Sequence, residues 1–122
     1  MLESERYLSL ATFRRDGREV ATPIWFAHEG GAMVAFSAGD AGKVKRLRNS
    51  PRARVAACDM RGNVQGPWHE ARGEIMSDAA AIQRALIALR KKYGVMMLLA
   101  DFFSRLSGRY QKRAYLRIVP TS

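Results

Sequence analysis

The chain has 122 residues, of which 48% are hydrophobic, a size and composition that predict one globular domain over residues 1–122. Its 21 basic and 11 acidic side chains give a formal net charge of +10, which points to an anionic partner: a nucleic acid, an anionic membrane or a phosphorylated small molecule. The single cysteine, Cys58, excludes an internal disulfide and a multi-cysteine zinc site.

The first third of the chain predicts an antiparallel meander of three strands. Residues 7–14 alternate in the manner of a strand, and Asp16-Gly17 then supplies a hairpin turn. A second strand passes through Val20 and Phe26 and ends at the turn of residues 29–31, after which residues 33–37 form a third strand.

The remaining elements alternate between strands and helices. A short basic helix follows residue 40, residues 52–60 and 68–76 form two more strands, and Gly73 suggests a bulge or bend in the second of these. Ser77 is the expected N-cap of a helix that ends at Gly94, and a second amphipathic helix covers residues 96–106 before a last strand at 110–119. Five or six antiparallel strands of this length predict a small, mainly β barrel with helices (α+β), because closure removes the exposed sheet edges.

No segment predicts export or membrane insertion. The first ten residues lack a basic stretch followed by an apolar run, so they do not resemble a signal peptide. The most apolar run, residues 95–100, is far shorter than the roughly 20 residues that cross a bilayer. We therefore expect a cytoplasmic protein with no membrane partner.

Residues 37–54 combine a glycine-bearing turn with the short basic helix. Gly39 and Gly42 let the backbone approach a ligand, Ser37 offers a hydroxyl, and the amides of the first helical turn carry the positive end of the helix dipole, features typical of a phosphate site. Residues 41–54 contain no acid and six basic side chains: Lys43, Lys45, Arg46, Arg48, Arg52 and Arg54. This bias favours an anionic ligand over a merely solubilising surface, which usually mixes both signs.

Three blocks of sequence resemble the pyridoxamine 5'-phosphate oxidase-like split β-barrel family. They are the strand ATPIWF at residues 21–26, the spacing Ser-x5-Lys-x7-Pro-Arg from residue 37 to 52, and the pairing of CDMRG at 58–62 with GPW at 66–68. The resemblance covers nearly the whole chain and is strongest to the F420-dependent and FMN-binding oxidoreductase branch. It implies a six-stranded antiparallel split β-barrel with a short basic helix and a C-terminal helical pair before the last strand.

The same resemblance implies a function. The chain would transfer hydride between coenzyme F420 or FMN and an unidentified small organic substrate, as a homodimer with the cofactor in a groove at the subunit interface. The residues implied at the cofactor are Thr22, Pro23, Ile24 and Trp25 beside the ring, Ser37, Ala41, Gly42, Lys43 and Arg46 toward the phosphate and any acidic tail, and Trp68 of the partner subunit. Full-length pyridoxamine phosphate oxidases carry a further C-terminal substrate segment that is not found here, so pyridoxamine phosphate oxidation is not expected.

No catalytic side chain is predicted, because a flavin or 5-deazaflavin transfers hydride through its own ring. The acidic residues form no paired-carboxylate site by their spacing. His69 follows Trp68 on a strand and is either a proton donor near the ring or an ordinary surface residue.

Other interpretations of the same residues stay open. A non-catalytic binder or carrier of a flavin, a deazaflavin or heme would use the same fold, and no sequence feature separates it from an enzyme. A barrel for single-stranded nucleic acid is less favoured, because residues 41–54 contain no aromatic side chain for base stacking. Trp25 is explained equally well by barrel packing, and the apolar stretch around Met96 and Phe102 by a core, a dimer face or a pocket for a planar ligand.

Overall fold

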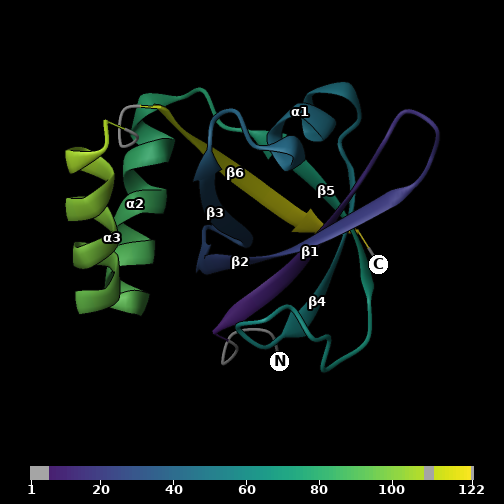
Figure 1. Cartoon of the computed structure of the whole chain (residues 1–122), viewed down its shortest axis with the longest axis horizontal. Coiled ribbons are helices and arrows are strands. Elements are labelled where there is room, and N and C mark those ends of the chain that lie inside the picture. Colours follow the sequence, from purple (N-terminus) through teal and green to yellow (C-terminus); the bar gives the residue numbers. More distant parts are fainter. Residues whose placement is uncertain (1–5, 109–111, 122) are drawn as a thin grey trace.

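Six antiparallel strands close into a barrel that is accompanied by three helices (Figure 1). The computed structural model describes residues 6–108 and 112–121. The strands are β1 (Tyr7–Phe13), β2 (Glu19–Glu29), β3 (Ala32–Ala38), β4 (Arg52–Cys58), β5 (His69–Ile75) and β6 (Arg113–Pro120), and the helices are α1 (Gly42–Asn49), α2 (Ala79–Tyr93) and α3 (Val95–Leu106). Around the barrel the strands follow the order β1-β2-β3-β6-β5-β4. The predicted six-stranded split barrel is therefore confirmed.

The turn between β1 and β2 fixes the register of the first hairpin. Gly17 adopts φ +88°, a conformation that L side chains rarely take, and Asp16 Oδ1 accepts a hydrogen bond from the backbone N–H of Arg18 at 3.1 Å. The resulting register places Tyr7 opposite Trp25 at the far end of the hairpin. Two aromatic side chains of the candidate site are thus brought together by a turn about ten residues away.

The barrel interior is filled by apolar side chains from the strands, among them the fully buried Phe26, and by Leu47 from α1, which covers one end. Gly73 of β5 serves this packing, because a Cβ added there would lie 3.0 Å from Leu47 Cδ2. Of the bulge or bend expected at Gly73, the bulge is absent: β5 pairs with β6 in continuous register, Gly73 opposite Ile118. The glycine is explained by the close approach of α1 to the strand and not by an extra residue in the ladder.

The helical pair α2 and α3 lies beside the barrel, where α2 packs on β2 and β3 (Figure 1). A second apolar cluster there joins Ala27 and Val34 of the strands to Leu89 and Met97 of the helices. Neither α2 nor α3, nor any other helix of the described residues, has the length and hydrophobicity needed to cross a membrane.

The ends of α2 show one prediction to be wrong and another to be correct. The N-cap is Asp78, whose Oδ2 accepts a hydrogen bond from the N–H of Ala81 at 2.9 Å, and not Ser77. Gly94 ends α2 as predicted, with φ +56°, and α3 begins at the next residue. The start of the last predicted strand, at residues 110 and 111, lies outside the described residues, and β6 begins at Arg113.

Candidate functional site

An apolar groove of about 420 Å³ lies outside the barrel, between β2 and the first half of α3. It is lined by Tyr7, Pro23, Ile24, Trp25, Phe36, Lys43, Met60, Met96 and Ala100. Its volume is within the range typical of ligand sites, and one cationic side chain stands among apolar and aromatic ones. The groove therefore suits a planar apolar molecule that carries an anionic group.

The aromatic wall of the groove is held by a tyrosine of α2. Trp25 stacks on Tyr93 with ring centroids 4.8 Å apart and meets the edge of Phe36 at 6.2 Å. The Tyr93 hydroxyl accepts a hydrogen bond from the N–H of Phe26 at 2.8 Å and donates to the carbonyl oxygen of Arg6 at 2.6 Å. Burial raises the pKa of Tyr93 to about 12, so the hydroxyl stays protonated and keeps this bridge at alkaline pH values where an exposed tyrosine ionises.

A buried ion cluster supports the other side of this wall. The guanidinium of Arg113 lies over the Phe36 ring, 4.3 Å from its centroid, and donates to Asp101 Oδ1 at 2.8 Å. Asp101 also accepts a hydrogen bond from Arg90 Nε at 3.1 Å, so its carboxylate joins α2, α3 and β6. The orientation of Phe36 is therefore fixed by charges that are not themselves exposed in the groove, since the Arg113 side chain is only 4% exposed.

Lys43 supplies the cation of the groove. It lies in the first turn of α1, and its Nζ is 3.4 Å from Ser37 Oγ at the end of β3. Burial lowers the pKa of Lys43, and the nearby charge of Arg46 lowers it further. An ammonium group that has lost part of its hydration without gaining a carboxylate in the described structure is well placed to bind an anion.

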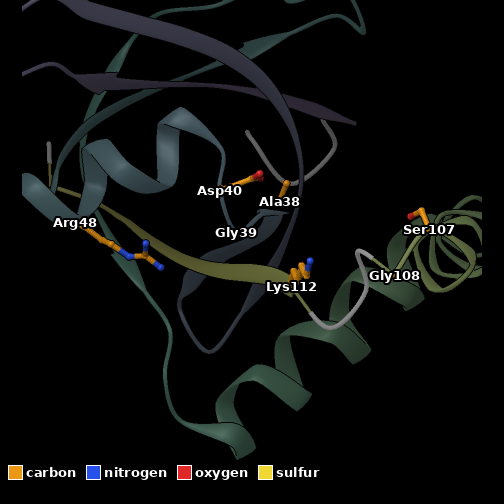
Figure 2. Close-up of a pocket in the computed structure, with 7 residues that line it drawn as sticks. All are labelled: Ala38, Gly39, Asp40, Arg48, Ser107, Gly108 and Lys112. Carbon is orange, nitrogen blue, oxygen red and sulfur yellow. The ribbon is translucent and has the colours of Figure 1, made fainter.

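A larger hollow of about 710 Å³ has a different character (Figure 2). The β3–α1 connection contributes Gly39 and Asp40, α1 contributes Arg48, and the chain around the end of α3 contributes Ser107 and Lys112. A Cβ at Gly39 would collide with the backbone oxygen of Lys112 at 2.3 Å, which explains the glycine by packing alone. The lining of this hollow has no aromatic side chain among the residues that the structure describes, whereas the smaller groove has three, so we take the groove as the candidate site for a planar ring.

The structure brings together some of the residues predicted at the cofactor and separates others. Pro23, Ile24, Trp25 and Lys43 line the groove, and Ser37 contacts Lys43. Thr22 does not line it, and its buried Oγ1 has no hydrogen-bond partner among the described residues. Ala41 is the N-cap residue of α1, while Gly42 and Arg46 line a separate basic hollow.

Two further predicted candidates lie away from the groove. Trp68 precedes β5 and stacks beneath the guanidinium of Arg54, 4.9 Å from its ring centroid. His69 pairs with Val55 in the β4–β5 ladder and does not line the groove. A contribution of Trp68 from a partner subunit stays a prediction.

Four groove residues were not predicted from the sequence: Tyr7, Phe36, Met60 and Ala100. The predicted hairpin could have indicated Tyr7, because a strand register that joins residues 7 and 25 follows from the Asp16-Gly17 turn. Ala100 gives no such signal, since it reaches the groove only through the packing of α3 beside the barrel. Met96 belongs to the apolar stretch for which a pocket for a planar ligand was one interpretation, and it does line the groove.

Comparison with known families places this geometry in context. The model of the pyridoxamine 5'-phosphate oxidase family matches residues 1–121. The chain belongs to this family. No curated protein matches this family member in sequence.

Solved structures share the fold of this pyridoxamine 5'-phosphate oxidase family member. A conserved hypothetical protein from Mycobacterium tuberculosis is 23% identical, with a TM-score of 0.73 over 99% of this chain and 76% of that one. HutZ, the heme storage protein from Vibrio cholerae, is 14% identical, with a TM-score of 0.74 over 98% and 84%. An FAD-binding protein from Mesorhizobium loti is 21% identical, with a TM-score of 0.63 over 99% and 83%. Identities this low establish the fold and leave the ligand to be argued from the groove.

Proposed function

We propose that this protein is an oxidoreductase that binds FMN or coenzyme F420 in the groove beside β2 and transfers hydride to or from a small organic substrate. The observation that carries the proposal is the position of Lys43. Its half-buried ammonium stands at an apolar groove with an aromatic wall, next to the Ser37 hydroxyl and the first turn of α1. This arrangement provides for the two parts common to both cofactors, a phosphate and a planar ring.

The residues of the groove fit such a cofactor. Lys43, Ser37 and the first-turn amides of α1 would hold the phosphate, while Pro23 and Trp25 on β2 would border the ring. A bound flavin or deazaflavin supplies the hydride-transfer chemistry through its own ring system. The protein's part is to orient the ring, to keep water from it with Met60 and Met96, and to balance the phosphate charge with Lys43.

The likeness to an FAD-binding protein supports a flavin-type ligand on this fold. Titration of the purified protein with FMN and with coenzyme F420, followed by absorbance and, in a Trp68→Phe background, by the fluorescence of Trp25, tests the proposal. We expect saturable binding of at least one of them with quenching of Trp25, which lies in the groove. Absence of binding by both, with the protein folded, would refute the proposal.

A homodimer is the second element of the proposal. Six apolar side chains of α3 are between 53% and 70% exposed: Val95, Leu98, Leu99, Phe102, Phe103 and Leu106. Contiguous apolar patches of this extent typically mark an interaction surface. The same helix lines the groove with Met96 and Ala100, so a second copy packed on this face would also cover the groove.

Light scattering of wild type and of the double variant Phe102→Glu/Phe103→Glu tests this assembly. Two carboxylates on an exposed helix face should leave the monomer folded and prevent burial of the face, so we expect a dimer for wild type and a monomer for the variant. If wild type and the variant are both monomers, or both dimers, α3 is not the dimer interface.

Heme binding is the second candidate function. The likeness to a heme storage protein supports it, as do two methionines in the groove, Met60 and Met96, because a thioether is a known heme ligand. Titration with hemin separates the two: a Soret band that shifts on binding and is lost in Met96→Leu would favour heme. The redox state of the bound cofactor separates a carrier from an enzyme. Only an enzyme would oxidise or reduce the cofactor when a substrate is added.

A further inference from the structure

A separate hollow of about 450 Å³ lies between the β1–β2 turn and α1. Its lining, which we call the basic hollow, consists of Arg14, Arg15, Asp16, Arg18, Gly42, Lys45, Arg46 and Asn49. Among the described residues, it shares no lining residue with the cofactor groove. The first turn of α1 separates the two sites, with Gly42 in the basic hollow and Lys43 in the groove.

The basic hollow carries five cationic side chains against one carboxylate. That carboxylate, Asp16, is already bound by Arg18 Nε at 2.8 Å. Within residues 6–108 and 112–121, no carboxylate lies within ion-pairing distance of the other four cations: Arg14, Arg15, Lys45 and Arg46. The charges therefore repel one another: burial lowers the pKa of Arg46, and the nearby charge of Arg14 lowers it further.

Neutral groups hold two of these cations in place. Arg46 Nε donates to Thr12 Oγ1 at 2.7 Å, which anchors the guanidinium against β1. Arg15 donates to Asn49 Oδ1 at 3.3 Å and so connects the hairpin turn to α1. These bonds position the side chains without neutralising them, so the charge is left for a ligand.

Other charged surfaces of the protein are arranged differently. On β4 and β5 the exposed arginines have acidic partners, such as Arg54 with Glu19 at 3.0 Å and Arg72 with Glu74 at 3.3 Å. A mixed surface of that kind is sufficient for solubility. The concentration of one sign around a concave site is a feature of anion binding, because the field is focused there.

We propose that the basic hollow is a second ligand site, which takes a multivalent anion of the polyphosphate or oligocarboxylate class. Four unneutralised cations match an anion of several charges better than a single phosphate. The anion is either a separate molecule or the far end of a long ligand whose ring lies in the groove. The site itself does not depend on the proposed oxidoreductase activity.

The test uses inorganic tripolyphosphate as the probe, titrated by calorimetry at 50 mM salt. The double variant Arg14→Ser/Lys45→Ser removes two cations of the hollow, and Arg61→Ser/Lys91→Ser removes two exposed cations elsewhere as a charge-matched control. We expect one site per chain, with affinity at least about tenfold weaker in the first variant and within about threefold of wild type in the control. Equal weakening in both variants would overturn the proposal, because it would show a response to net charge alone.

Competition experiments identify the source of the anion and guard against binding at Lys43. Tripolyphosphate that competes with coenzyme F420 but not with FMN would assign the hollow to the far end of the groove ligand. If tripolyphosphate competes with neither FMN nor coenzyme F420, the basic hollow belongs to a separate ligand. Each of these two outcomes supports the basic hollow as an anion site. Competition with FMN that persists unchanged in Arg14→Ser/Lys45→Ser would place the probe at the groove instead and overturn the proposal. Circular dichroism of each variant checks that the fold is kept.

Discussion

Replacing Lys43 with alanine should weaken cofactor binding strongly. A charge-assisted hydrogen bond to phosphate contributes about 1.5–3 kcal/mol. The Lys43 ammonium is already partly desolvated in the free protein, which is why its pKa is lowered, so less hydration is lost on binding. We therefore expect the upper part of the range, about 2–3 kcal/mol, or roughly a 30- to 150-fold increase in Kd. Fluorescence titration with FMN measures it.

Three controls separate the charge of Lys43 from its packing. The Lys43 side chain is partly buried, whereas an unpartnered surface lysine would be fully exposed. Lys43→Met therefore keeps the packing of the apolar stem while removing the charge. It should bind FMN as weakly as Lys43→Ala. Lys43→Arg should recover part of the affinity, and Lys45→Ala should stay within about threefold of wild type, since Lys45 points about 200° around α1 from Lys43. Equal FMN affinity in wild type and Lys43→Met would refute the phosphate assignment.

Three further outcomes are expected. The affinity for FMN should fall as pH rises through the lowered pKa of Lys43, because the ammonium loses its charge, and the fall should begin below the ordinary lysine pKa of 10.5. Kd measured from pH 7 to 10 tests this, and Lys43→Arg should show no such decline. Asp101→Asn should lower the free energy of unfolding in urea by about 3–5 kcal/mol, because it leaves the buried guanidinium of Arg113 without its carboxylate; a loss below 1 kcal/mol would contradict this. Tyr93→Phe should cost about 1–3 kcal/mol, since the N–H of Phe26 loses its acceptor. Because the pKa of Tyr93 is raised, the unfolded chain releases a proton between about pH 10 and 12 that the folded protein retains, so wild type should lose stability across this range. Urea titrations should show that Tyr93→Phe lacks this loss.

The succession of strands and helices along the chain was predictable because local signals agree with the fold, whereas the order β1-β2-β3-β6-β5-β4 around the barrel came only from the structure. Asp16-Gly17 marks the first hairpin, and Gly94 ends α2 with the positive φ that glycine permits. The N-cap of α2 could not be chosen from the sequence, because Ser77 and Asp78 are adjacent and both are residue types preferred at N-caps. Only the hydrogen bond from the N–H of Ala81 identifies Asp78 as the cap. The sequence also did not distinguish a Gly73 that forms a bulge from a Gly73 that leaves room for the Leu47 side chain of α1.

The candidate site divides in the same way. The sequence by itself determined the cationic segment, the pair of Ser37 at the end of β3 and Lys43 in α1, and the Pro23–Trp25 strand, because each depends on residues close in the chain. Only the tertiary structure determined that Met96 of α3 lines the same groove as Trp25, that Arg113 lies over the Phe36 ring, and that Arg46 lines the basic hollow. These neighbours meet through the packing of α1 and α3 on a closed barrel, and periodicity along the chain indicates which side of a helix is buried but not which strand it will contact.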